Sequence, residues 1–448
     1  MSIKKYSMIA RLVFALLILW FAGAAQALPK IESWKTDKGA KVLFVAAHEL
    51  PILDVRIVFD AGSARDGDKA GVAALTNALL DQGAAGMDAD AIAAGFEQRG
   101  AKLGSGSERD MAWLSLRSLS DEKLLKPALD LFRKVLASPD FPEADFERER
   151  QRTLTGLEYE KQRPKSLVEN AFYHDVYARH PYAGNPSGEE DSVAALSVAD
   201  LRAFYRRYYV ARNATLVLVG DISRKQAETI AARLADALPA GEKAPPLPEV
   251  AALKGASTQF IEYPSTQSNV LMGQPGVRRG DPDYFALYVG NHVLGGSGLV
   301  SRISEEIREK RGLSYSAYSY FVPMRQDGPY TLGFQTRNEK REEALAVLRD
   351  TVRKFVEQGP TEKELKASKD NIIGGFPLAV SSNSKITEYL AMIGFYDLPL
   401  DYLSTFTDRI QAVTAKQIRD AFRRRVKVDD MVTVIVGSKS SSSSDAGS

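Results

Sequence analysis

The sequence of 448 residues contains no cysteine and only four histidines. The absence of cysteine excludes disulfides, thiolate zinc sites and cysteine-protease chemistry. Neither sign of charge is in excess, because 59 Lys and Arg face 57 Asp and Glu, a formal net charge of +2. That balance is far from the strongly basic surface that nucleic-acid binding requires. With 44% hydrophobic and 26% charged residues the composition is that of a globular protein, and the length predicts more than one domain.

An apolar run at residues 12–22 lies close to the N-terminus. Positive residues precede it, and Ala25 and Ala27 supply the small-x-small pattern that a signal peptidase cleaves. The run is shorter than the roughly 20 residues that span a bilayer, so we expect a removable signal at residues 1–27 and no lasting contact with a membrane. Its removal takes away three cations and no anions, which leaves 56 against 57 and a net charge of −1. An exported chain without cysteine indicates a periplasmic location.

Prolines cluster near the middle of the chain. Residues 238–255 hold four prolines and two glycines, and proline at this density excludes helix and central strand because it removes backbone donors and fixes φ. We therefore expect a linker at 241–255, between an N-terminal domain at 28–240 and a C-terminal domain at 256–438. The Ser-rich end at 439–448 is too polar to pack and is expected to be disordered.

The two halves end in similar segments. Residues 201–220 align without a gap with residues 418–437, and six of the twenty positions match. Each copy predicts a helix with Ser197 or Thr414 as its N-cap, followed by a β-branched strand that ends at glycine. Such a number of matches could arise by chance, but the equal place of the two segments at the end of each half favours an internal duplication.

Helical and strand patterns alternate within each half, which predicts an α+β fold. A turn is expected at residues 49–51. The expected strands are 41–47, 54–59, 113–119, 268–273 and 315–322, and the expected helices are 70–81, 121–137, 142–162, 284–294 and 301–310.

The most specific stretch of the chain lies in the second half. Leu-Gly-Gly-Ser-Gly-Leu at 294–299 leads to Arg302 and then to Glu-Ile-Arg-Glu-Lys-Arg-Gly-Leu-Ser-Tyr at 306–315. Together with motifs in the first half, this stretch resembles the pitrilysin/insulinase peptidase family, in the short-chain class related to the mitochondrial processing peptidase. The first-half motifs lie at 48–51, 60–66, 71–75, 141–149, 180–182 and 219–221. The resemblance implies two homologous α/β domains of about 200 residues each, of the LuxS/processing-peptidase-like metalloenzyme type, that form half of a clamshell.

The zinc motif of that family is missing. Active members carry H-x-x-E-H on a helix, in which the two histidines bind one Zn²⁺ and the glutamate is the general base. Aligned after Gly71, the motif falls on Ala74, Asn77 and Ala78, which can neither bind a metal nor take a proton from water near neutral pH. The family's third ligand, a glutamate, falls near residues 154–157, which are Leu-Thr-Gly-Leu. The resemblance thus implies no zinc and no catalytic residue in this chain, which we expect to be inactive alone.

The four histidines offer no replacement for the missing ligands. His48, His174, His180 and His292 include no pair four positions apart. A surface position is expected for His48 and structural roles for His174 and His180. A peptidase with relocated ligands is therefore the least favoured hypothesis.

A second set of family residues is present. The resemblance implies that Arg308, and Tyr315 seven positions later, contact the substrate near the zinc. A guanidinium and a phenol can both donate hydrogen bonds to the oxyanion that forms during peptide hydrolysis. Without the resemblance, Arg308 would be one charge of a solvated helix and Tyr315 a packed strand residue.

The glycine-rich loop before these residues is a further candidate for peptide contact. Glycine permits positive φ and close backbone approach, while the Gly-Lys-Ser/Thr ending of a phosphate-binding loop is absent. The loop consists of Gly295, Gly296, Ser297 and Gly298.

A chain that has lost the zinc motif but kept the Arg/Tyr pair resembles the non-catalytic, substrate-binding subunit of a heterodimeric zinc peptidase. We expect a homologous partner that carries H-x-x-E-H and the zinc, and a peptide as substrate. The alternative is a non-enzymatic scaffold or peptide-binding protein with the same fold, as in core subunits of respiratory complexes. Absence of a partner with an intact motif would favour that alternative.

Overall fold

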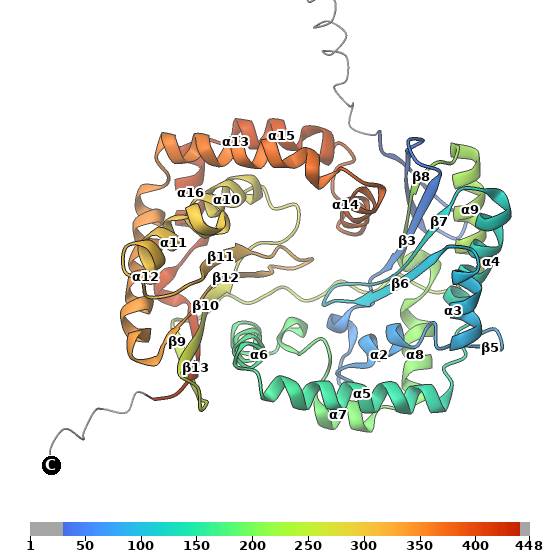
Figure 1. Cartoon of the computed structure of the whole chain (residues 1–448), viewed down its shortest axis with the longest axis horizontal. Helices are drawn as coiled ribbons and strands as arrows, with labels where there is room; N and C mark the ends of the chain where they lie inside the picture. Colours follow the sequence, from blue (N-terminus) through green and yellow to red (C-terminus); the bar gives the residue numbers. More distant parts are fainter. Residues whose placement is uncertain (1–29, 440–448) are drawn as a thin grey trace, which may run out of the picture. The chain divides into compact units, whose positions relative to one another are not determined.

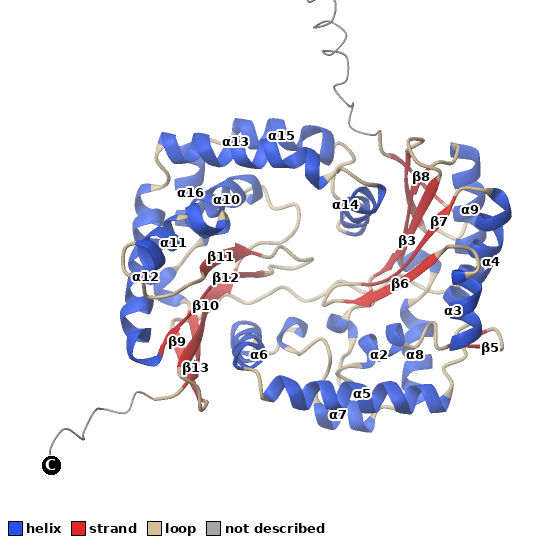
Figure 2. Cartoon of the chain, viewed as in Figure 1, coloured by secondary structure: helices blue, strands red, loops and turns tan. Residues whose placement is uncertain are grey.

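The computed structural model describes residues 30–439 of the chain. The expected signal at 1–27 and all but the first residue of the expected tail lie outside this range. Residues 31–439 belong to one compact unit, which is a mixture of helices and two main sheets (Figure 2). Between residues 30 and 439, no helix combines the length and the apolar character needed to cross a membrane.

The first sheet has six strands in the order β1-β2-β8-β3-β7-β6, in which only β2 and β8 are parallel neighbours. Its strands are β1 (Glu32–Lys35), β2 (Lys41–Ala46), β3 (Ile52–Phe59), β6 (Lys102–Ser107), β7 (Ala112–Leu119) and β8 (Ala214–Gly220). The helices of this half are α2 (Val72–Ala78), α3 (Ala89–Glu97), α4 (Glu122–Ala137), α5 (Glu143–Lys161), α6 (Pro164–Tyr177), α7 (Glu190–Ala195), α8 (Val198–Tyr208) and α9 (Arg224–Ala237). A small ribbon pairs β4 (Gly83–Ala84) with β5 (Met87–Asp88).

The second sheet has five strands in the order β11-β12-β10-β13-β9, in which only β13 and β9 are parallel. Its strands are β9 (Ser257–Glu262), β10 (Gln267–Pro275), β11 (Ala317–Phe321), β12 (Pro329–Arg337) and β13 (Val432–Gly437). The helices of this half are α10 (Tyr284–Asn291), α11 (Arg302–Ser304), α12 (Arg341–Gln358), α13 (Glu362–Ala379), α14 (Asn383–Phe395), α15 (Tyr402–Ala412) and α16 (Ala415–Arg425). The predicted α+β fold class is confirmed.

The repeat expected from the sequence is present in the structure. Helix α8 follows Ser197 and α16 follows Thr414, and each cap side chain forms a capping box with the residue three positions later. In both copies a short 3₁₀ turn then leads to the central strand, which ends at Gly220 or Gly437. The two predicted N-caps and both strand ends are therefore confirmed.

Each sheet is covered on one face by a helix from the other half of the chain. Helix α6 packs on β10 and β13, and α14 packs on β8 and β3 (Figure 1). Phe172 of α6 is fully buried, and a Cβ added to Gly273 of β10 would lie 2.8 Å from its ring. A Cβ added to Gly394 of α14 would lie 2.6 Å from both Leu43 and Thr215. Each half thus contributes one helix that covers the sheet of the other half.

The opposite face of the first sheet packs on helices of its own half. Side chains alternate along a strand, and those of Leu53, Val55 and Ile57 join the core formed with α2, α4 and α8. Leu43 and Thr215 point the other way, toward α14. The central strands are consequently buried on both faces, which explains the unbroken apolar run of β8.

Three predicted helices are shorter than expected. Helix α2 begins only at Val72, because Gly71 has a left-handed φ of 96°. Helix α10 ends at Asn291 and continues as a π-helical turn at His292–Gly296. A second π-helical turn at Glu305–Glu309 follows α11. The local sequence patterns did not predict these wider turns, which are frequent at functional sites.

The proline-rich linker has neither helix nor strand, as predicted. It is nevertheless packed, since Ala244 and Leu247 are both buried. The Ala244 N–H donates to Asn213 Oδ1 at 3.1 Å, and the Leu247 carbonyl accepts from Gln326 Nε2 at 3.0 Å. The linker therefore contacts both halves, while the exact domain bounds stay a prediction.

Candidate functional site

The helix that aligns with the zinc motif is anchored at its start by Asp66. Its two carboxylate oxygens accept hydrogen bonds from Gly71 N at 2.8 Å and Ala73 N at 2.9 Å. Burial raises the pKa of Asp66 to about 7, although both backbone donors favour the ionised form. These two hydrogen bonds hold the first turn of α2. In the sequence, Asp66 could be recognised only as an acidic residue shortly before a predicted helix.

The three motif positions point in two directions. Ala74 is half-buried and Ala78 is exposed, so these two lie on the accessible side of α2. Asn77 is only 3% exposed, and its Nδ2 donates to the carbonyl of Trp113 and to Tyr209 Oη, both at 3.3 Å. The residue at the position of the general base therefore forms hydrogen bonds inside the core.

The third ligand position is also unsuited to a metal. Helix α5 packs beside α2, but Leu154 lies against the apolar core and its neighbours Thr155 and Gly156 are exposed. Methyl groups and an alkyl side chain have no lone pair for Zn²⁺. The residues present do not fit the zinc ion that the motif holds in active relatives.

The histidines do not converge elsewhere. Over residues 30–439, no group of three His, Cys, Asp or Glu side chains is arranged to hold a metal ion. His48 is exposed and lies 2.7 Å from Asp221, as expected for a surface position. His180 accepts from Tyr182 N at 3.1 Å and contacts the Pro248 carbonyl at 3.0 Å, and burial lowers its pKa.

The remaining two histidines are likewise engaged by neighbouring side chains. His174 is mostly exposed and lies 3.1 Å from Asp175. His292 Nδ1 lies 2.8 Å from Ser368 Oγ, and its Nε2 lies 3.2 Å from Asn371 Oδ1. Burial lowers the pKa of His292, and its two contacts join the π-helical turn after α10 to α13.

Arg308 and Tyr315 are brought together. The guanidinium carbon of Arg308 lies 4.8 Å from the centre of the Tyr315 ring, within the range of a cation–π contact. Arg308 is on the π-helical turn at Glu305–Glu309, and Tyr315 is 83% exposed. The pair therefore presents a guanidinium and a phenol side by side at the surface, where both can donate hydrogen bonds to a ligand.

The glycine-rich loop is divided between packing and exposure. A Cβ at Gly295 would lie 2.6 Å from Ser319 N of β11, and one at Gly296 would lie 3.0 Å from Asn291 Nδ2. Gly295 therefore permits close packing on the edge strand, and Gly296 permits close packing on Asn291 of α10. Gly298 has a φ of +64° with open space around it, and Ser297 is half-buried, so only the second part of the loop is free to contact a ligand.

The segment between the loop and Arg308 is held by an ion pair. Arg302 Nε and Nη2 donate to the two oxygens of Glu364 at 2.6 and 2.7 Å. Burial alone would raise the pKa of Glu364, but the hydrogen bonds from Arg302 and Thr361 lower the pKa to about 2.

The free energy of unfolding should fall in acid as Glu364 takes up a proton. Because the pKa of Glu364 is lowered from 4.5 to about 2, its contribution is complete above pH 4.5 and is lost as the pH falls toward 2. E364Q should lower the free energy of unfolding at pH 7 by about 1–2 kcal/mol and flatten this part of the profile. Urea denaturation over a pH series measures both effects. E362Q, an exposed neighbour in the same helical turn, is the control, and an unchanged acid profile for E364Q would contradict the assignment.

Comparison with known proteins covers both halves of the chain. Residues 41–187 match the family described as Insulinase (Peptidase family M16), and residues 195–372 match the Peptidase M16 inactive domain. A solved structure of a peptidase M16 inactive domain from Pseudomonas fluorescens is 43% identical, with a TM-score of 0.89 over 91% of this chain and 98% of that chain.

Some curated relatives are named as non-peptidases and others as zinc proteases. The non-peptidase homolog YmxG of Helicobacter pylori is 25% identical over 89% of this chain and 92% of its own length. An uncharacterized zinc protease of Streptomyces coelicolor is 25% identical over 77% of this chain and 76% of its own length. With matches over both halves and the motifs described above, this chain belongs to the insulinase (M16) peptidase family and has lost the zinc-binding residues of its active members.

Proposed function

We propose that this chain is the non-catalytic, substrate-binding subunit of a periplasmic zinc peptidase made of two kinds of chain. The observation that carries the proposal is the contrast between its two sites. The positions of the zinc ligands hold Ala74, Ala78 and the Leu-Thr-Gly-Leu segment at 154–157, whereas Arg308 and Tyr315 lie together at the surface. Family membership supports a peptide as the ligand, and the expected signal at 1–27 supports the periplasm.

The environment of the pair supports a role in ligand binding. Arg308 has a single ion pair within residues 30–439, a long one of 3.5 Å from its Nε to Glu309 Oε1. Tyr315 is far more exposed than a strand-forming aromatic that stabilises a core. A guanidinium and a phenol that are not used by the fold remain available for a substrate.

The chemistry assigned to this chain is hydrogen-bond donation. Peptide hydrolysis places negative charge on the oxygen of the scissile carbonyl, and donors that already face this oxygen stabilise that charge. Arg308 and Tyr315 would each donate to the carbonyl oxygens of a bound peptide. The metal and the general base would belong to the partner, since Ala74, Asn77 and Ala78 stand where the motif has its two ligands and its base.

Activity should require both chains. The mature chain is purified alone and with an M16 chain from the same organism that carries H-x-x-E-H, and zinc content and cleavage of a peptide library are measured. We expect no cleavage by this chain alone and chelator-sensitive cleavage by the mixture. Chelator-sensitive cleavage by this chain alone would contradict the proposal, and a stable mixture without any cleavage would favour the scaffold.

R308A should lower kcat/KM of the active mixture by about 10- to 100-fold. The loss of one donor to a developing oxyanion costs about 100- to 1000-fold in a closed active site, and a partly exposed pair is expected to contribute less. R311A is the matched control, because Arg311 lies nearby and bonds Glu306 instead. Equal activity of R308A and the wild type would remove the role assigned to the pair.

A further inference from the structure

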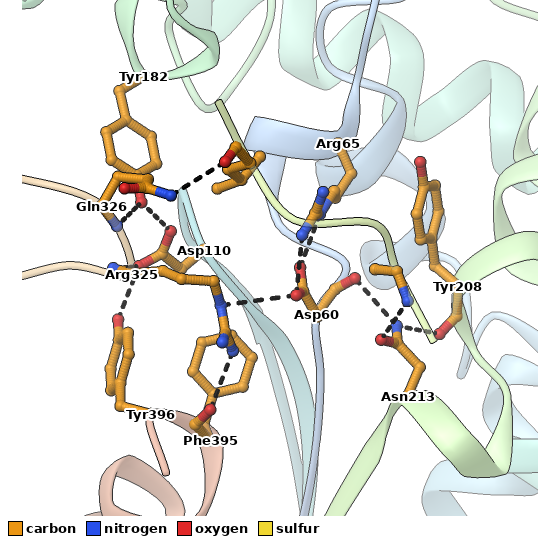
Figure 3. Close-up of polar contacts among 12 residues, drawn as sticks. Asp60, Arg65, Asp110, Tyr182, Tyr208, Asn213, Arg325, Gln326, Phe395 and Tyr396 are labelled. Carbon is orange, nitrogen blue, oxygen red and sulfur yellow. Dashed lines mark hydrogen bonds and ion pairs between the residues drawn. The ribbon is translucent and has the colours of Figure 1, made fainter. Parts of the chain in front are cut away.

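One buried carboxylate joins four segments from both halves of the chain. Asp110, in the turn between β6 and β7, is 3% exposed. Its Oδ1 accepts from Tyr182 Oη at 2.6 Å, and its Oδ2 accepts from the backbone N of Arg325 at 2.7 Å and from Tyr396 Oη at 2.9 Å (Figure 3). Tyr182 Oη in turn accepts from Gln326 N at 3.0 Å. Asp110 and Tyr182 belong to the first half, and the other three residues belong to the second.

The Arg325 side chain forms a second bridge beside the first. Its Nε lies 3.5 Å from Asp60 Oδ2, and its Nη2 donates to the Phe395 carbonyl at 2.9 Å. Asp60 is also bound by Arg65 of its own half. A buried carboxylate of the first half is therefore paired with a half-buried guanidinium of the second, and removal of one would leave the other less well satisfied.

The segment held by these contacts is the turn between β11 and β12, residues 322–328. Strand β11 begins two residues after Tyr315 and pairs along its length with β12. At the start of the strand, Ser314 Oγ donates to the Gln335 carbonyl of β12 at 2.6 Å. Fixing the turn at one end of this hairpin therefore also limits the movement of Tyr315 at the other end.

We propose that Asp110 is a positioning residue that locks the β11–β12 hairpin to the first half of the chain. The lock sets the place of the Arg308–Tyr315 pair relative to α2. The importance of that place rests on the proposed function, whereas the lock itself does not. In a two-chain peptidase, substrate would then enter by movement between the chains, because the two halves of this chain move as one body.

Hydrogen exchange tests the lock in the chain alone. In D110N one of the two acceptor oxygens becomes a donor, so at least one of the three donors loses its partner. We expect amide exchange in residues 322–328 and 393–398 to become about 10-fold faster, with α4 and α12 unchanged. D54N is the matched control, because Asp54 is an equally buried carboxylate bound by Arg117 within the first half.

A distance measurement tests whether the hairpin itself moves. The chain has no cysteine, so K102C/Q335C carries spin labels only at two exposed sites, one on β6 and one on β12. We expect a narrow distance distribution in the wild-type background and in D54N, and a broad one in D110N. Y396F removes one donor while keeping the ring, so it should give an intermediate result if D110N does not fold.

The results separate the lock from the proposed function. A broad distribution in D110N or Y396F, together with an inactive mixture of wild-type chains, would support the lock and reject the two-chain peptidase. Distributions in D110N and Y396F as narrow as in D54N, or equal exchange in the 322–328 segment of D110N and D54N, would overturn the lock whatever the activity.

Discussion

R65A is expected to lower the free energy of unfolding by about 3–5 kcal/mol. Arg65 Nε and Nη2 donate to the two oxygens of Asp60 at 2.7 and 2.9 Å, and both side chains are more than nine-tenths buried. Without the guanidinium, Asp60 keeps a negative charge in the interior with only the longer contact to Arg325 as compensation. Urea denaturation at pH 7 with linear extrapolation measures the loss.

R212A is the control for that prediction. Arg212 forms an ion pair with Glu242 at 2.9 Å, but the two side chains are 60% and 75% exposed. Water and salt screen such a pair, so its loss should cost at most about 1 kcal/mol. If R65A and R212A had equal effects, the buried pair would not stabilise the fold in the manner described.

F172A is expected to cost about 3–5 kcal/mol, the range for a large aromatic side chain removed from a core. Phe172 is fully buried on α6 and fills the space above Gly273, which belongs to the sheet of the other half. The loss should therefore destabilise both halves together although the substitution lies in the first. Urea denaturation followed by both circular dichroism and tryptophan fluorescence measures it, and both probes should report one shared transition.

Y159A provides the comparison for F172A. Tyr159 lies on α5 and is 56% exposed, so its removal should change the free energy of unfolding by about 0.5 kcal/mol or less. A small effect of F172A, or separate transitions of the two halves in the wild-type chain, would show that α6 and α14 do not couple the sheets.

Local sequence patterns predicted four elements closely. Strands 41–47 and 113–119 and helices 121–137 and 142–162 differ from β2, β7, α4 and α5 by at most one residue at either end, because alternating and helical spacings are properties of short segments. The N-caps at Ser197 and Thr414 were found for the same reason. The two π-helical turns were missed. At the first of them Gly295 meets Ser319, a contact that forms only when distant segments pack together.

The candidate site was predictable where it depends on residue type. Alanine cannot bind zinc in any environment, so Ala74 and Ala78 alone indicate the loss of the metal site. The inward orientation of Asn77 was not predictable, because it depends on Trp113 and Tyr209, which lie far away in the chain. The family resemblance implied that Arg308 and Tyr315 contact the substrate, which stays a prediction, and the structure shows that the two side chains contact each other.

Spacing and the chemistry of single side chains were enough to establish the α+β class, the duplicated ends of the two halves and the absence of zinc ligands at the motif positions. Which sheet each helix covers depends instead on packing between segments that lie far apart in the chain. The spacing of apolar residues in α6 or α14 predicts a helix with one apolar face, but it does not specify which sheet that face covers. Close packing of Phe172 against Gly273 and of Gly394 against Leu43 selects the sheet of the other half, and buried pairing at Asp110 then joins the halves.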